Sequence, residues 1–218
     1  MKQSVLIISG WAHGLNAIQP LGDALADRFD VQLRTGAEVL RDRCIPETDY
    51  IVTGSMSGLL AMELLPEHCR KLVLISSTAK FCAGEGYACG TPEKVLRRMI
   101  VQLKRKPEAV LEEFFRNVHF PHRQNRQGIA LKHENTGELL DGLEYLLAAD
   151  VRDKVPALEI PVLLLHGAQD RIIPPSASEW LHAHLPDSRL RIFDQHGHAL
   201  PAHCFTPVMS ELQAFLEQ

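Results

Sequence analysis

The chain has 218 residues, of which 45% are hydrophobic and 23% are charged, and its formal net charge is −4. This length and composition are typical of one soluble α/β domain with a full core. No segment approaches the run of about 18 apolar residues that a membrane span needs, so the chain is not expected to bind a membrane by spanning it. We expect no nucleic-acid partner for the chain either.

Short apolar segments rich in β-branched residues recur along the chain, with helical periodicity between them. We expect strands at 4–9, 31–34, 50–54, 71–76, 161–167 and 190–194, and helices at 18–29, 58–69, 174–185 and 206–218. The first, fourth and fifth strands are apolar almost throughout, which is typical of parallel strands buried on both faces. The alternation of strands and helices therefore predicts an α/β fold with a doubly wound, mostly parallel sheet.

The interval 78–153 contains helical patterns and no convincing strand. We interpret it as a helical cap inserted into an α/β-hydrolase-like core that is formed by residues 1–77 and 154–218. The first cap helix should turn one apolar side toward the sheet edge, and at 100° per residue this side contains Val95, Leu96, Met99, Ile100 and Leu103.

The opposite side of that helix is strongly basic. Between Lys94 and Arg126 there are nine basic and three acidic residues, which give a local charge of +6, whereas the rest of the chain carries −10. A basic region on an acidic protein either binds an acidic partner or is simply a solvated helix surface, and the sequence leaves both interpretations open.

Three reactive side chains each come directly after a predicted strand. Ser55 follows the strand at 50–54, Asp170 follows the fifth strand, and His198 follows the sixth. The carboxyl ends of parallel strands meet at one edge of a sheet, where reactive groups collect. The order Ser, Asp, His is also that of the α/β-hydrolase catalytic triad. We therefore predict that Ser55 is a nucleophile, that His198 is its general base, and that Asp170 orients the imidazole.

Two serines compete for the role of nucleophile. The sharp turn that exposes such a serine requires small residues two positions before and two positions after it. Thr53 and Ser57 flank Ser55 in this way, although they replace both glycines of the G-x-S-x-G motif. Leu59 would collide with the turn if Ser57 were the nucleophile, so Ser55 is favoured.

Two histidines compete for the role of base, and an oxyanion formed during attack would need N–H donors. We favour His198 over His196 because "GHALP" continues into a loop and a helix, as in the hydrolase pattern. The expected oxyanion donors are the main-chain N–H groups of Met56, at the start of the next helix, and of Trp11, in the loop after the first strand.

No metal and no cofactor are expected. The histidines do not form an H-x-x-x-H pattern with a paired carboxylate. The five cysteines are scattered without a C-x-x-C pair, and the N-terminal residues lack the basic and apolar regions of a secretory signal. Both observations favour reduced thiols and a cytoplasmic location.

Several stretches resemble a known family. "SGWAHGLNA", "TGSMSGLLA", "KLVLISST" and "IFDQHGHALPAH" resemble the α/β-hydrolase carboxylesterases of biotin biosynthesis that demethylate pimeloyl-acyl-carrier-protein methyl ester, and the likeness extends over most of the chain. The resemblance implies that Phe114, Phe115 and Val118 of the cap line the channel for the acyl chain. It also implies that an acidic acyl carrier protein binds the basic cap face, formed by Arg97, Arg98, Lys104, Arg105, Arg123 and Arg126.

Two other functions fit the same sequence. A general short-chain carboxylesterase or thioesterase, acting on small-molecule esters, would keep the triad without a carrier protein. A non-catalytic binding protein would keep the hydrolase fold with a vestigial triad. Labelling with a fluorophosphonate separates the second of these from an enzyme, because only a reactive Ser55 would be modified.

Overall fold

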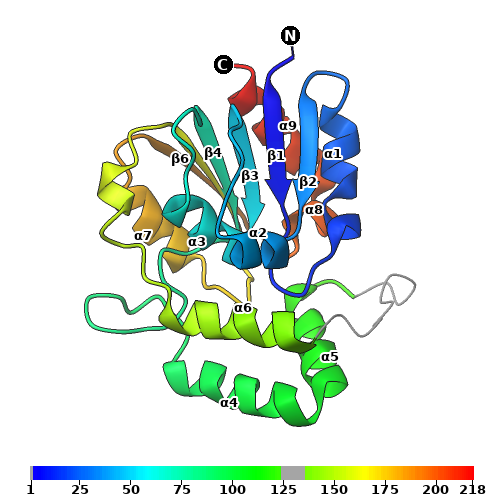
Figure 1. The fold of residues 1–218 in the computed structure, drawn as a ribbon, viewed down its shortest axis with the longest axis vertical. Helices are drawn as coiled ribbons and strands as arrows, with labels where there is room; N and C mark the ends of the chain where they lie inside the picture. The colour runs from blue at the N-terminus through cyan, green and yellow to red at the C-terminus, as the bar shows by residue number, and fades with distance from the viewer. Residues whose placement is uncertain (1, 124–135) are drawn as a thin grey trace.

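The computed structural model describes residues 2–123 and 136–218, and in it six parallel strands form one sheet in the order β2-β1-β3-β4-β5-β6 (Figure 1). The strands are β1 (Ser4–Ile8), β2 (Asp30–Arg34), β3 (Tyr50–Gly54), β4 (Lys71–Ile75), β5 (Val162–Gly167) and β6 (Ser188–Phe193). All six predicted strands are present, and the predicted doubly wound fold is confirmed. The strand order reverses between β1 and β3, which is where α/β sheets form their binding crevice.

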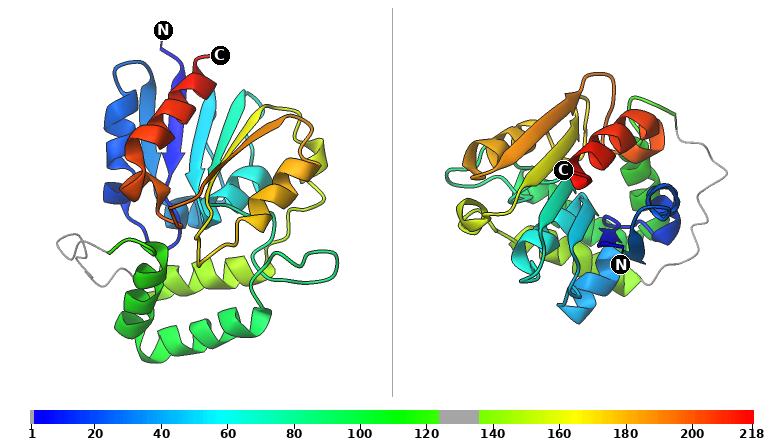
Figure 2. Two further views of the ribbon diagram at one scale, coloured as in Figure 1. Left: turned by 180° about the vertical axis from the view of Figure 1, so that it is seen from behind. Right: turned by 90° about the horizontal axis from the view of Figure 1, so that it is seen from above.

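Helices cover both faces of the sheet (Figures 1 and 2). One face carries α1 (Gln19–Leu25), α8 (Leu200–His203) and α9 (Phe205–Leu216), and the other carries α2 (Gly36–Asp42), α3 (Met56–Glu63) and α7 (Ser176–His184). Successive residues of β1 therefore enter opposite cores: Val5 and Ile7 pack with α1 and α9, whereas Leu6 and Ile8 pack with α2 and α3. Burial on both faces explains why the central strands are apolar throughout.

Three further helices lie beyond the carboxyl ends of the strands, and we call them the cap helices (Figure 1). They are α4 (Glu93–Arg105), α5 (Pro107–Val118) and α6 (Thr136–Ala148), and the short 3-10 helix η3 (Val155–Ala157) comes after them on the way to β5. α4 buries Leu96, Ile100 and Leu103. The predicted place of Val95 on this side is wrong, because its side chain is 50% exposed.

Side-chain contacts attach α6 to the core. The indole Nε1 of Trp11 donates to the Leu139 carbonyl at 2.8 Å, and Tyr145 donates its hydroxyl hydrogen to Glu63 at 2.9 Å. Gly142 is required at the Trp11 contact, since a Cβ there would lie 2.4 Å from the indole Cδ1. The loop after β1 and the cap are therefore packed against each other.

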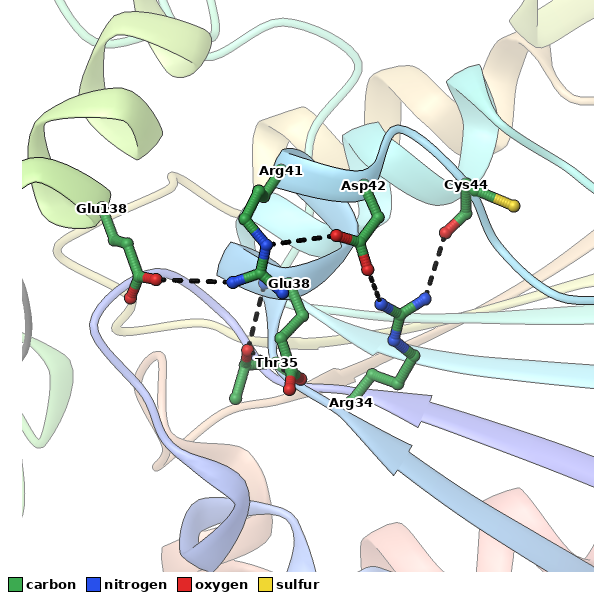
Figure 3. A network of polar contacts seen from close by, with 7 residues as sticks. All are labelled: Arg34, Thr35, Glu38, Arg41, Asp42, Cys44 and Glu138. Atoms are coloured by element: carbon green, nitrogen blue, oxygen red, sulfur yellow. Dashed lines mark hydrogen bonds and ion pairs between the residues drawn. The ribbon is translucent and has the colours of Figure 1, made fainter.

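Helix α2 begins with a capping box and ends near the cap. Thr35 Oγ1 accepts from Glu38 N at 3.2 Å, and the Glu38 carboxylate accepts from Thr35 N at 2.7 Å. Figure 3 shows Arg41 between Asp42, at 3.1 Å, and Glu138 of α6, at 3.5 Å. Among the residues described, no helix combines the length and apolar character needed to cross a bilayer.

Candidate active site

Ser55 occupies a strained turn between a strand and a helix. It is the single residue between β3 and α3, and its backbone angles are φ 57° and ψ −122°. A non-glycine residue adopts such a conformation only where its surroundings enforce it. A serine on a sharp strand-to-helix turn is the arrangement that exposes a nucleophile above an α/β sheet.

Neighbouring groups hold this turn in place. Ser77 Oγ donates to the Ser55 carbonyl at 2.9 Å, and a Cβ at Gly58 would lie 1.9 Å from Ser77 Oγ. On the other side, a Cβ at Gly10 would lie 3.1 Å from the Ser55 Cβ. Ser57, the competing serine, is fully buried and its hydroxyl binds the Ser9 carbonyl, so it does not face a substrate site.

Asp170 and His198 form a hydrogen-bonded pair. The His198 Nδ1 lies 2.6 Å from Asp170 Oδ2, and Oδ1 accepts from the main-chain N–H groups of Ile172 and Ile173 at 2.7 and 3.0 Å. Burial alone would raise the pKa of Asp170, but the imidazoles of His198 and His166 and their hydrogen bonds hold it well below its usual range. The carboxyl group is therefore an ionised and oriented acceptor.

His166 is a site residue that sequence reasoning did not identify. It is fully buried near the end of β5, and its Nε2 lies 3.2 Å from Asp170 Oδ2. A histidine inside the otherwise apolar stretch "PVLLLHG" was the available signal, because a buried imidazole needs polar partners.

Ser55 and His198 face the same cavity, which has a volume of about 420 Å³. The Ser55 hydroxyl and the His198 Nε2 are both without a hydrogen-bond partner among the described residues. Their main chains are fixed by two adjacent serines after β4: Ser76 Oγ donates to the His198 carbonyl and Ser77 Oγ to the Ser55 carbonyl, each at 2.9 Å. The structure thus brings both groups to one cavity but leaves the bond between them open.

The cap contributes apolar walls to this cavity. Phe115 and Val118 of α5 line it, together with Leu139 of α6. Phe114, expected to line the channel, does not; its ring packs edge-on against Trp11, with 4.6 Å between ring centroids and 87° between planes. Adjacent residues on a helix point about 100° apart, so Phe114 and Phe115 cannot both face the cavity.

The two expected oxyanion donors lie on either side of the serine turn. Met56 is the first residue of α3, and Trp11 is in the loop after β1. Their main-chain N–H groups have no hydrogen-bond partner among the described residues. The Trp11 ring, in contrast, is buried and bonded to the cap, so only its main chain is available to a ligand.

Histidines outside the Asp170–His198 pair surround the cavity. Burial lowers the pKa of His13 from 6.5 to about 4, although its bond to the Trp11 carbonyl opposes the shift. Burial and the neighbouring His203 and His13 lower the pKa of His119 to about 4 as well. His196, the competing base, is 3.1 Å from His122 and does not line the cavity. The cavity walls are therefore neutral at pH 7.

The basic residues of the cap lie on its outer side. Arg97, Arg98, Lys104 and Arg105 of α4 are exposed, and Arg97 pairs with Glu93 at 2.6 Å. Arg123 is exposed beyond α5, whereas Arg126 lies outside the described residues. Val95 and Val101, each 50% exposed, lie on the same helix.

Comparisons with known proteins place this geometry in a wider context. A family model described as serine aminopeptidase, S33, matches residues 39–202. A pimeloyl-[acyl-carrier protein] methyl ester esterase of Nitrosomonas europaea is 31% identical, over 89% of this chain and 88% of its own length. A protein of the same name from Vibrio cholerae is 27% identical over 99% and 92%. An esterase structure from Exiguobacterium antarcticum superposes with a TM-score of 0.84 at 18% identity, over 99% of this chain and 92% of that one.

Proposed function

The chain belongs to the α/β-hydrolase family that includes the pimeloyl-[acyl-carrier protein] methyl ester esterases, and from this membership we propose that it hydrolyses its ester through an acyl-enzyme on Ser55. It is a carboxylic ester hydrolase. The observation that supports the proposed mechanism most strongly is the 2.6 Å bond between His198 and the buried Asp170, in a cavity that Ser55 also lines.

The reaction can be derived from the properties of these groups. Ser55 Oγ attacks the ester carbonyl while His198 Nε2 takes its proton, and the ionised Asp170 stabilises the imidazolium. The oxyanion accepts hydrogen bonds from the N–H groups of Trp11 and Met56, each worth on the order of 10²–10³ in rate. His198 then protonates the departing alcohol. Water, deprotonated by the same imidazole, releases the acid and restores Ser55.

The proposed substrate is the methyl ester of a pimeloyl chain on acyl carrier protein, which would make this an enzyme of biotin biosynthesis. The named relatives support this choice, and so does the shape of the cavity. Its walls at Phe115, Val118 and Leu139 are apolar, as a methylene chain requires. We assign residues 78–153, which include these three, to a cap domain over the core.

The carrier protein would bind the outer side of the cap. Carrier-bound substrates present an acidic protein surface, and the exposed cations of α4 with Arg123 provide the complementary charge. Val95 and Val101 add apolar area to the same helix. Arg126 belongs to the proposed surface by sequence alone.

A fluorophosphonate probe and a growth assay test the proposal. We expect the probe to label wild type and not Ser55→Ala, and we expect wild type but not Ser55→Ala to restore growth of a biotin auxotroph that lacks its methyl esterase. A chain that remains unlabelled would be the non-catalytic binding protein instead.

Charge reversal separates a carrier-dependent enzyme from a general esterase or thioesterase. Arg97→Glu with Arg98→Glu should lower activity on a carrier-bound ester about 10-fold or more, and leave hydrolysis of p-nitrophenyl acetate within about twofold. Arg189→Glu, on the exposed edge strand β6, is the matched control. Equal effects of the cap variant on both esters would favour the general esterase.

A further inference from the structure

A second imidazole contacts the same carboxylate oxygen that His198 uses. His166 Nε2 lies 3.2 Å from Asp170 Oδ2, while His198 Nδ1 lies 2.6 Å from it. His166 is 0% exposed and reaches neither solvent nor the cavity. It therefore cannot touch a substrate, and any role in the reaction must act through Asp170.

The surroundings of His166 determine where its ring carries hydrogen. Besides Asp170 Oδ2, Nε2 has the Ile173 carbonyl at 2.9 Å. A carbonyl and a carboxylate only accept, so Nε2 carries a hydrogen whether the ring is neutral or charged. On the other side, Nδ1 lies 2.7 Å from the hydroxyl of Ser178, which can donate to it in the neutral ring. Both ring nitrogens are thus satisfied in one orientation.

This arrangement completes the set of donors around the buried carboxylate. Oδ1 receives the N–H groups of Ile172 and Ile173, and Oδ2 faces the two imidazoles. Because His166 also binds the Ile173 carbonyl, it ties the end of β5 to the loop that contains the acid. A carboxylate held on both oxygens cannot rotate away from His198.

We propose that His166 is a positioning residue for the ester hydrolysis, a role that rests on the proposed function of Ser55, Asp170 and His198. Its Nε2–H keeps Oδ2 oriented toward His198 and withdraws part of the negative charge that Oδ2 would otherwise offer to the imidazolium. His198 is thereby kept in register with Ser55 and is less basic than it would be beside an otherwise free carboxylate.

Two amide variants separate this role from simple packing. The amide nitrogen of glutamine reaches the place of Nε2, whereas that of asparagine reaches only the place of Nδ1. His166→Asn should lower kcat on p-nitrophenyl acetate about 10-fold with KM unchanged, and raise the acid-limb pKa of kcat/KM by about half a unit or more. His166→Gln should stay within about threefold of wild type in kcat and keep the acid limb unchanged. The other histidine that contributes to the field at His198 is His13, which both variants leave in place.

A measurement on wild type does not depend on the variants folding. In protein with ¹⁵N-labelled histidine, His166 should show a hydrogen on Nε2, with the signal assigned by its loss in His166→Gln. A neutral ring protonated on Nδ1 instead would overturn the proposal. So would a His166→Asn variant with wild-type kcat and acid limb, or a His166→Gln variant that loses as much as His166→Asn.

These outcomes are distinct from failure of the proposed function. An inert wild type that no fluorophosphonate labels would remove the esterase mechanism and, with it, the role of His166. A labelled, active wild type whose two amide variants behave alike would remove the role of His166 only.

Discussion

The two ends of the proposed proton-transfer chain differ in how completely the structure fixes them. At the Asp170 end, two main-chain N–H groups and two imidazoles surround a buried carboxylate. At the Ser55 end the main chain is fixed, but the hydroxyl faces the cavity without a partner among the described residues. The groups that keep one partner throughout the reaction are preformed, and the group that exchanges a hydrogen bond for an acyl group is left free.

Removing the charge at the fixed end should have the largest effect. In Asp170→Asn the amide can no longer accept from all of its neighbours, and His198 is left in the wrong tautomer. We expect kcat on p-nitrophenyl acetate to fall about 10⁴-fold. Asp150→Asn is the control, because Asp150 pairs with Lys80 and Arg152 and does not line the cavity. It should lose stability only, and comparable kinetic losses in the two variants would contradict the comparison.

Gly58→Ala tests the main chain of the serine end. The new Cβ would lie 1.9 Å from Ser77 Oγ, which holds the Ser55 carbonyl. We expect the free energy of unfolding to fall by about 2 to 3 kcal/mol and kcat to fall with it. Combining it with Ser77→Gly removes the side chain that clashes, so urea titrations should show partial recovery. No recovery would mean that the clash is not the cause.

Acid should affect the two ends in separate pH windows. The pKa of His13 and His119 is lowered from 6.5 to about 4, so between these values the unfolded chain binds protons that the folded chain excludes. Stability should therefore fall by about 1 to 3 kcal/mol as pH drops from 6.5 to 4. Asp170, whose pKa is lowered from 3.8, contributes stability above 3.8 that is lost only at still lower pH.

Unfolding midpoints in urea across this range measure both windows. His13→Asn should flatten the upper window and leave the lower one. A loss confined to pH below 4 in wild type would show that the cavity histidines are not held neutral.

The smallest effect is expected at the contact between α2 and the cap. Arg41 and Glu138 are 3.5 Å apart, and their side chains are 59% and 40% exposed. Exposed pairs of this kind contribute less than about 1 kcal/mol, so Glu138→Gln should shift the urea midpoint little and leave kcat within about twofold. A large kinetic loss would indicate that this pair sets the position of the cap over Ser55.

The sequence predicted the sheet and the order of the reactive groups because both depend on local patterns. Apolar β-branched runs mark the strands, and a parallel arrangement brings the residues just after each strand to one edge of the sheet. Helix α2 was missed although Thr35 and Glu38 spell a capping box, since its seven residues are too few for a clear periodicity.

Contacts between distant segments could not be predicted in the same way. His166 and Asp170 are four residues apart, but they meet only because the chain turns back after β5. The choice between Phe114 and Phe115 depends on how α5 is rotated against Trp11, and this rotation is set by tertiary packing. Helical periodicity likewise assigned Val95 to the wrong side of α4, where packing leaves it in solvent.

The left-handed backbone at Ser55 makes reactivity a burden on the fold. At φ 57° and ψ −122° glycine is at ease and every other residue pays in conformational energy, on the order of 1 to 3 kcal/mol. The hydroxyl that the reaction needs is thus retained against the preference of its own turn. A glycine at this position would yield an inert protein that tolerates heat better than its active parent.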